Sequence, residues 1–168
     1  MAFSIYQASV PIFLKTLGNL SAILDKGAAF AEEKKVDPQV LLNYRLAPDM
    51  FPLSRQVQAA ADHAKRGTAY LAGIEAPAYP DTEATFAELK ARIEKTTAFI
   101  GSVKAGQIEG AETRDIVLKM GSSSRTLTGQ TYLLHQCLPN FFFHTTTAYN
   151  ILRHCGVNIG KRDFIGQI

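Results

Sequence analysis

Apolar residues recur at steps of three and four in four separate stretches of the chain, and this spacing limits the folds that it can adopt. Such steps place side chains on one face of an α-helix. Four helices with one apolar face each must bury those faces against one another, so the pattern predicts an all-α helix bundle. The four stripes are Val10, Phe13, Leu14, Leu17, Leu20 and Leu24; Leu53, Val57, Ala60, Ala64 and Leu71; Phe86, Leu89, Ile93, Thr96, Ile100 and Val103; and Leu134, Cys137, Leu138, Phe141, Ala148, Ile151 and Leu152.

Capping and breaking residues predict where the first three helices begin and end. The first should end near Gly27 or in the charged run after it. Asp49 is a good N-cap for the second, which should stop before Pro77, and Asp81 or Thr82 should cap the third. These limits leave a connector of roughly twenty residues between the first two helices. Because antiparallel neighbours need only short turns, we expect a crossover connection there.

The sequence between the third and fourth helices has a different character. Two short, partly β-branched runs, Asp115–Met120 and Arg125–Gln130, flank a glycine and serine turn. They predict a small β-hairpin that is an insertion and not a core sheet.

The fourth helix should extend from about Thr131 to Cys155, with Gly156 closing its C-terminal end. Pro139 should bend it near His135, because proline cannot donate to the carbonyl four residues before it.

Length, charge and cysteine content narrow the possible functions. The 168 residues fit a single domain, 1–168. Lys and Arg exceed Asp and Glu by 18 to 15, and these basic residues are scattered, so nucleic-acid binding is not expected. No stretch approaches the roughly 18 apolar residues of a membrane span, and no signal peptide is apparent. Cys137 and Cys155 lie too far apart on one helix for a disulfide, so we expect a cytoplasmic protein with reduced thiols.

The spacing of the four histidines decides which of them could share a metal. No His-x-x-x-His motif occurs, and His144 and His154 would lie about 15 Å apart along a helix, too far for one ion. Asn140 precedes His144 by four residues, so both side chains point toward one region from adjacent turns. They form either a satisfied structural pair or part of a ligand site. His63, beside basic residues, is expected to be exposed on a flank of the second helix.

Several stretches carry a family resemblance: Ser9 to Pro11, Leu46 to Leu53, Pro139 to His144 with Thr147 to Tyr149, Leu152 to Val157, and Gly160 to Phe164. On them, and over essentially its whole length, the chain resembles the DinB/YfiT-like metalloenzyme superfamily, in particular its domain-of-unknown-function branch DUF1993. The resemblance implies an antiparallel four-helix bundle with a long crossover that forms a homodimer.

The resemblance also implies a site. Metal-binding members carry one histidine on the second helix and a His-x-x-x-His on the fourth. Counting back twelve residues from Gly156 places that pair at Asn140 and His144, and the second-helix ligand falls at Gln58 or Ala59. The full triad is absent, and His144 is the one candidate metal ligand. Because amides bind zinc and nickel weakly, no tight metal site is expected. Gln58, Asn140 and His144 are predicted to line a pocket for a small molecule.

Two functional hypotheses follow from these observations. The first, which we favour, is a dimeric small-molecule-binding or scaffold protein with a degenerate metal site. The second is a metal-dependent enzyme of the thiol-transferase or hydrolase kind, in which His144 is the remaining metal ligand or a general base. The second hypothesis needs a third ligand, such as water or His63.

Overall fold

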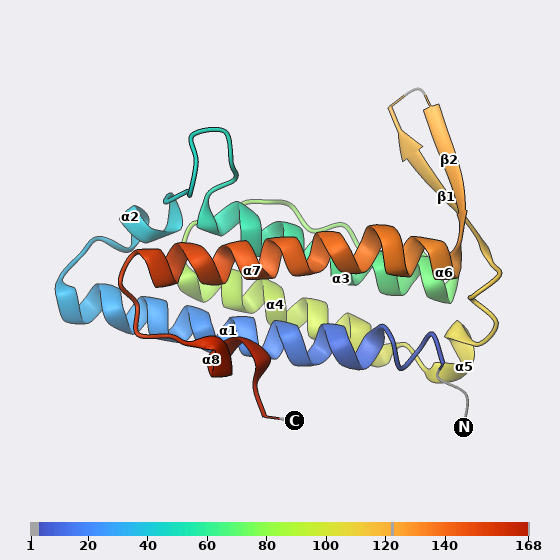
Figure 1. The fold of residues 1–168 in the computed structure, drawn as a ribbon, viewed down its shortest axis with the longest axis horizontal. Coiled ribbons are helices and arrows are strands. Elements are labelled where there is room, and N and C mark those ends of the chain that lie inside the picture. The colour runs from blue at the N-terminus through green and yellow to red at the C-terminus, as the bar shows by residue number, and fades with distance from the viewer. Residues whose placement is uncertain (1–3, 122, 168) are drawn as a thin grey trace.

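The computed structural model describes residues 4–121 and 123–167. It is mostly helical, with four long helices lying side by side and a small two-stranded hairpin standing off one end (Figure 1). Among these residues, no helix is long and apolar enough to cross a membrane. The elements are α1 (Val10–Lys34), α2 (Pro38–Leu42), α3 (Leu53–Ala72), α4 (Phe86–Ser102), α5 (Ala105–Ile108), β1 (Asp115–Met120), β2 (Ser123–Thr128), α6 (Gly129–Tyr132), the π-helical turn η1 (Leu133–Cys137), α7 (Leu138–His154) and α8 (Lys161–Ile165).

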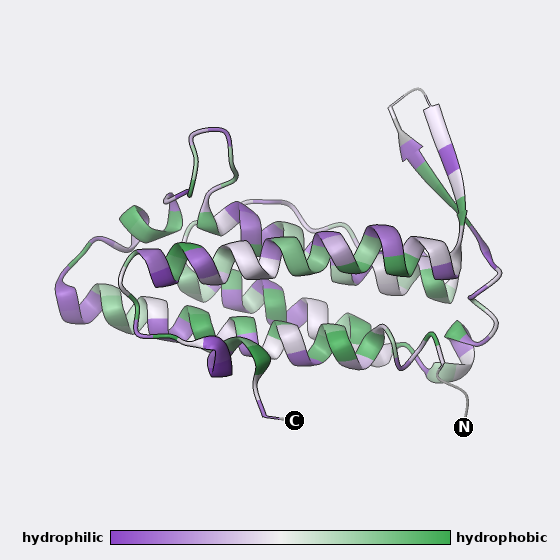
Figure 2. Cartoon of the chain, in the orientation of Figure 1, coloured by the Kyte–Doolittle hydropathy of each residue, from purple (hydrophilic) through white to green (hydrophobic). Residues whose placement is uncertain are grey.

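Each long helix is amphipathic and turns its apolar face toward a shared core. Apolar and polar residues alternate along α1, α3, α4 and α7 (Figure 2). Helix α3 packs on α7 and on α4, and α1 packs on α4. In the core, the rings of Phe13 on α1 and Phe141 on α7 meet edge to face with their centroids 5.0 Å apart. The predicted helical fold with a small hairpin is confirmed.

The crossover connection lies elsewhere than predicted. Helices α1 and α7 run in one direction and α3 and α4 in the other, so residues 73–85 return along the bundle to join two parallel neighbours (Figure 1). The connector between α1 and α3 joins helices of opposite direction. Its length was misleading because part of it folds as α2, where the Asp37 side chain accepts a hydrogen bond from the backbone N–H of Gln39.

The start of α3 differs from the prediction, whereas its end before Pro77 agrees with it. Asp49 does not cap this helix, because it lies in a turn that the backbone N–H of Met50 closes on the carbonyl of Ala47. The helix ends at Gly73, whose φ of +67° is left-handed, and the chain leaves the helix before it reaches Pro77.

The N-terminus of α4 also differs from the prediction. Thr85 forms a capping box with Glu88: the threonine hydroxyl accepts from the backbone N–H of Glu88, and the Glu88 carboxylate accepts from the backbone N–H of Thr85. Asp81 is not the cap, because it pairs with Arg92 at 2.9 Å. The predicted caps, Asp81 and Thr82, lie three to four residues before the actual one.

The Arg92 guanidinium, which is fully buried, anchors the crossover to the helices on either side of it. Its Nη1 donates to the carbonyl of Pro80 at 3.0 Å and to the Glu83 carboxylate at 3.1 Å. Its Nη2 lies 2.9 Å from a carboxylate oxygen of Asp62 on α3 and the same distance from Asp81. One side chain of α4 thus holds both α3 and the crossover in place.

The fourth long helix is continuous but irregular where the bend was expected. Between α6 and α7 the backbone N–H of Leu138 donates to the carbonyl of Leu133, the wider spacing of a π-helix. Pro139 follows directly. At the other end Gly156 has a φ of +96°, and Val157 N–H donates to the Leu152 carbonyl, so the predicted glycine termination is confirmed.

Two smaller elements complete the fold. Strands β1 and β2 pair antiparallel with Ile116 opposite Leu127, and these two side chains pack toward the core. The predicted bounds of β1 are confirmed, whereas β2 begins at Ser123, two residues before the prediction. Helix α8 docks on α1 through an ion pair of Lys26 with Asp163 at 2.6 Å.

The contact between α3 and η1 leaves no room for a side chain at Gly67. A Cβ placed there would lie 2.4 Å from the Sγ of Cys137, whereas one at Gly18 on α1 would meet nothing within 4 Å. We expect Gly67→Ala to lower the free energy of unfolding by about 1 to 3 kcal/mol. Gly18→Ala should leave it unchanged or raise it by about 0.5 to 1 kcal/mol. Urea denaturation of both variants measures this, and an equally stable Gly67→Ala would contradict the close contact.

Candidate functional site

A buried hydrogen bond joins the polar faces of α3 and α7. His144 on α7 is 8% exposed, and its Nδ1 lies 2.7 Å from the Oε1 of Gln56 on α3. The Gln56 amide is oriented by its own Nε2, which donates to the carbonyl of Phe51 at 3.1 Å. Because an amide oxygen only accepts, the His144 Nδ1 carries the proton. The Nε2 of the neutral ring therefore keeps its lone pair, the form needed in a base or a ligand.

His63 stacks on His144 and makes the site a pair of imidazoles. It lies seven residues after Gln56 on the same face of α3, and its ring centroid is 5.4 Å from that of His144 with 15° between the planes. Burial, together with the nearby His144 and Arg66, lowers the pKa of His63 to about 4, against the opposing effect of Asp62. The two rings are therefore neutral at neutral pH.

The pKa of His144 is also lowered. Burial is the larger cause, and the guanidinium of Arg55 adds to it. Two phenylalanine rings border this imidazole: Phe51 lies parallel to it at 6.3 Å and Phe143 edge-on at 5.3 Å. Both phenylalanines are about half exposed, so His144 lies just beneath an aromatic surface.

His63 also lines a cavity of about 200 Å³ between α3, β1 and the α6–η1 segment. Tyr70, Tyr132 and Gln136 line it as well, together with the cations Arg66 and Lys119. A cavity with aromatic walls and a few polar groups is the usual form of a small-molecule site. Nearby Cys137 is not a nucleophile, because burial raises the pKa of its thiol to about 12.

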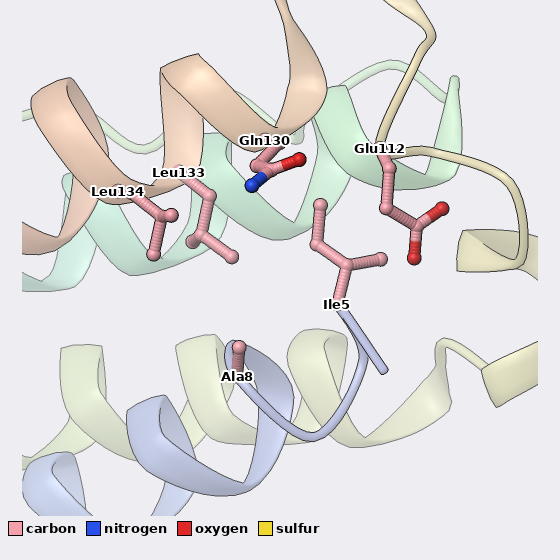
Figure 3. A pocket seen from close by; sticks show the side chains of 6 residues that line it. All are labelled: Ile5, Ala8, Glu112, Gln130, Leu133 and Leu134. Carbon is pink, nitrogen blue, oxygen red and sulfur yellow. The ribbon is translucent and has the colours of Figure 1, made fainter. Parts of the chain in front are cut away.

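A separate cavity of about 170 Å³ lies between the start of α1 and the α6–η1 segment (Figure 3). Ile5, Ala8 and Leu133 give it apolar walls, and Glu112 and Gln130 are its polar groups. Its lining includes none of the histidines, and it is the weaker candidate for a site with acid–base or ligand chemistry.

The three predicted pocket residues are not brought together. Gln58 lies two residues after Gln56, about 200° around the helix, and its Nε2 donates to Glu83 at 3.0 Å. The Asn140 amide donates to the carbonyl of Gln136 on its own helix at 2.6 Å. Of the two alternatives for Asn140 and His144, the structural pair is therefore not formed, because His144 takes Gln56 as its partner. Of the three, His144 alone belongs to this site.

Two further corrections concern residues that the sequence placed differently. His63 is half-buried and stacked, and the expectation of an exposed flank is wrong. Gln56 is not among the predicted site residues, although its separation of seven residues from His63 indicates that both share one helical face.

The donor set can be compared with that of a metal site. His63 and His144 offer two imidazoles, and the oxygen of Gln56 already accepts from His144. Within the described residues, no group of three His, Cys, Asp or Glu side chains could hold an ion. Catalytic zinc sites use three protein ligands, so the side chains present do not fit such a site.

Comparison with known proteins agrees with the expected family. A family model described as a domain of unknown function, DUF1993, matches residues 5–165. Among solved structures, the chain is similar to a DinB family member protein from Shewanella denitrificans, with 45% sequence identity and a TM-score of 0.93. That match covers 98% of this chain and 93% of the other. No curated protein matches.

The low pKa of His63 makes the stability of the protein depend on pH. The unfolded chain takes up a proton near pH 6.5 and the folded protein only near pH 4, so the free energy of unfolding falls as pH falls through this window. We expect a loss of about 1 to 3 kcal/mol, reduced by the partial exposure of the ring. His63→Phe should flatten the profile, and the exposed-site variant His135→Gln should not. Denaturation midpoints at pH 7.5 and pH 4.5 measure this; parallel profiles for wild type and His63→Phe would contradict it.

The incomplete donor set predicts weak metal binding. Protein purified without an affinity tag and then treated separately with zinc, nickel and manganese should hold well below one equivalent of each. Elemental analysis after desalting measures the content. Near-stoichiometric metal that disappears in His144→Ala would contradict this expectation and support a metal-dependent enzyme.

Proposed function

The chain belongs to the family described as a domain of unknown function, DUF1993, and from that premise we propose that it is a small-molecule-binding protein. The binding site is the seam between α3 and α7 at Gln56, His63 and His144, together with the cavity next to it. The ligand contacts the imidazoles through its polar groups and the tyrosines through its apolar part.

The stacked pair His63 and His144 is the observation that carries this proposal. Two neutral imidazoles sharing a half-buried face carry acceptor nitrogens, and such polar groups need partners when water is excluded. His63 also lines the cavity of about 200 Å³, together with Tyr132 and Gln136. A ligand there would gain both apolar burial and directed hydrogen bonds.

A second function is favoured by the tautomer of His144. Because Gln56 holds the proton on Nδ1, the Nε2 can take a proton from a bound substrate, as a general base does. This second function corresponds to the thiol-transferase or hydrolase hypothesis, with His144 as a general base and not as a metal ligand. Its support is weaker, since a pKa lowered by burial makes His144 a weaker base.

We also propose that the protein is a homodimer and is cytoplasmic. Phe51 and Phe143 border His144 with about half of each side chain exposed, and a second copy would remove this apolar surface from water. Cys137 and Cys155 are both free, as suits a reducing compartment. Light scattering on a size-exclusion column tests the dimer, and a monomer at micromolar concentration overturns it.

The binding function predicts ligand-detected changes at the seam. In a fragment screen followed by ¹⁵N-HSQC spectra, we expect hits that shift the amides near His63, Gln136 and His144. His144→Ala should weaken these hits by about tenfold or more, the effect of one lost hydrogen bond to a buried group. The exposed-site variant His135→Ala should bind the same hits as wild type.

The same variants separate a binding role from a structural one. His144→Ala removes the partner of Gln56, so some loss of stability is expected for either role. A lower melting temperature with unchanged binding of the hits would show that the pair is structural and would contradict the proposed site. Hydrolysis of activated esters that depends on His144 and Gln56 would instead favour the second function.

A further inference from the structure

A second, larger cavity of about 480 Å³ adjoins the one that His63 lines. Arg66, Tyr70 and Lys119 line both cavities, so the two adjoin between α3 and β1, and these three residues mark their junction. We call the two cavities together the hairpin groove. The hairpin stands off the end of the bundle at which α3 ends (Figure 1). The residues that line the groove come mainly from α3 with the segment after it and from β1.

We infer that the hairpin groove binds an organic anion: a carboxylate or phosphate head between Arg66 and Lys119, with an aromatic or branched apolar body along Tyr70, Ile74 and Val117. This inference rests on the proposed binding function and names the chemical class of its ligand.

The charges of the groove favour an anion. Arg66 comes from α3 and Lys119 from β1, so two separate elements each direct a cation to the junction of the two cavities. Arg66 meets Asp62 at a long 3.4 Å with most of its side chain exposed, and in the described part of the chain no ion pair involves Lys119. Both cations therefore retain much of their capacity to bind an anion.

The other titratable groups that face the groove do not cancel these cations. Glu75 is the one carboxylate among the residues that line it, and it belongs to the larger cavity alone. His63 is neutral at neutral pH. The anionic head should therefore lie at the junction, away from Glu75.

Exposed apolar side chains give the groove a wall that can bind the apolar body of a ligand. Tyr70, Ile74 and Val117 are 38%, 39% and 51% exposed, although they are large and apolar, and all three line the larger cavity. Tyr70 is held edge-on against Tyr132 with centroids 5.5 Å apart, so its ring offers a fixed surface. Such a wall suits the body of a ligand, and 480 Å³ is within the usual range for a small-molecule site.

The test compares ligands that share one body and differ in the charge of the head. The probes are 2-naphthoate, 2-naphthyl phosphate and 2-naphthylmethylamine, titrated into the ¹⁵N-labelled protein. We expect at least one anion to bind tenfold or more tightly than the amine and to shift amides of 66–76 and 117–119. The stronger of the two anions identifies the head as carboxylate or phosphate. Equal binding of anions and amine, or shifts confined to Ile5, Ala8 and Glu112, would overturn the inference.

Charge-removing variants localise the head. Arg66→Gln and Lys119→Gln should each weaken the better anion by about tenfold and leave the amine unchanged. Lys15→Gln and Arg153→Gln, at exposed positions of α1 and α7, are matched controls that should bind as wild type does. All four side chains are exposed, so the variants should fold. Wild-type affinity in both groove variants would refute the assigned cations.

The His144→Ala variant separates this inference from the proposed function. If it binds the anion normally while the Arg66 and Lys119 variants do not, the anion site in the hairpin groove is supported. The seam between α3 and α7 is then not part of that site. If His144→Ala no longer binds the anion and the two charge variants still do, the proposed function at the seam is supported and the inference of an anion site in the groove is wrong.

Discussion

The buried guanidinium of Arg92 is the interaction on which the arrangement of the helices depends. Removing a cation from water costs several kcal/mol unless carboxylates surround it. Here the carboxylates come from two places, Asp62 on α3 and the pair Asp81 and Glu83 in the crossover. All three carboxylates reach Arg92 because the crossover returns along α3. Helix α4 therefore begins beside the start of α3. As a consequence, α3 and α4 run parallel. The face of α3 that carries Gln56 and His63 then packs against α7.

The crossover is further fixed by Tyr79. Its ring lies under the ammonium groups of Lys65 and Lys95, at 4.1 and 4.4 Å from the centroid. Lys65 is nearly buried and also pairs with Asp62 at 2.9 Å. A connection without secondary structure is thus held by charged side chains from both helices that it joins.

Much of the fold was predictable, because helical spacing and glycine terminations are local signals. The stripes of Phe13 and Phe141 predicted the faces that meet in the core, and the first strand was correct in both limits. The position of the crossover was not predictable in the same way. It depends on Arg92, a charged residue whose burial is set by partners distant in the chain, and no periodicity reports such a pairing. The Thr85 cap was missed because several residues before it can also cap a helix.

The site was less predictable than the fold. His144 was identified from its sequence context, but its partner was sought four residues away on the same helix. Its true partner, Gln56, is 88 residues distant and lies across a helix interface. Counting from a family pattern chose Gln58, which has the same amide on the wrong face. A two-residue error on a helix moves a side chain by about 200°, so a motif count can name the correct helix and still miss the site.

The π-helical turn at Leu133–Cys137 has a consequence for how this fold can vary. An α-helix rotates by about 100° per residue, so one additional residue within a turn re-aims everything before it relative to everything after. The hairpin precedes this turn, and α7 with His144 follows it. The direction of the strands relative to α7 therefore depends on the number of residues in this turn. In a related sequence, deletion of one residue in this turn would rotate β1 and its Lys119 relative to α7. The groove could then be gained or lost without a substitution in either strand.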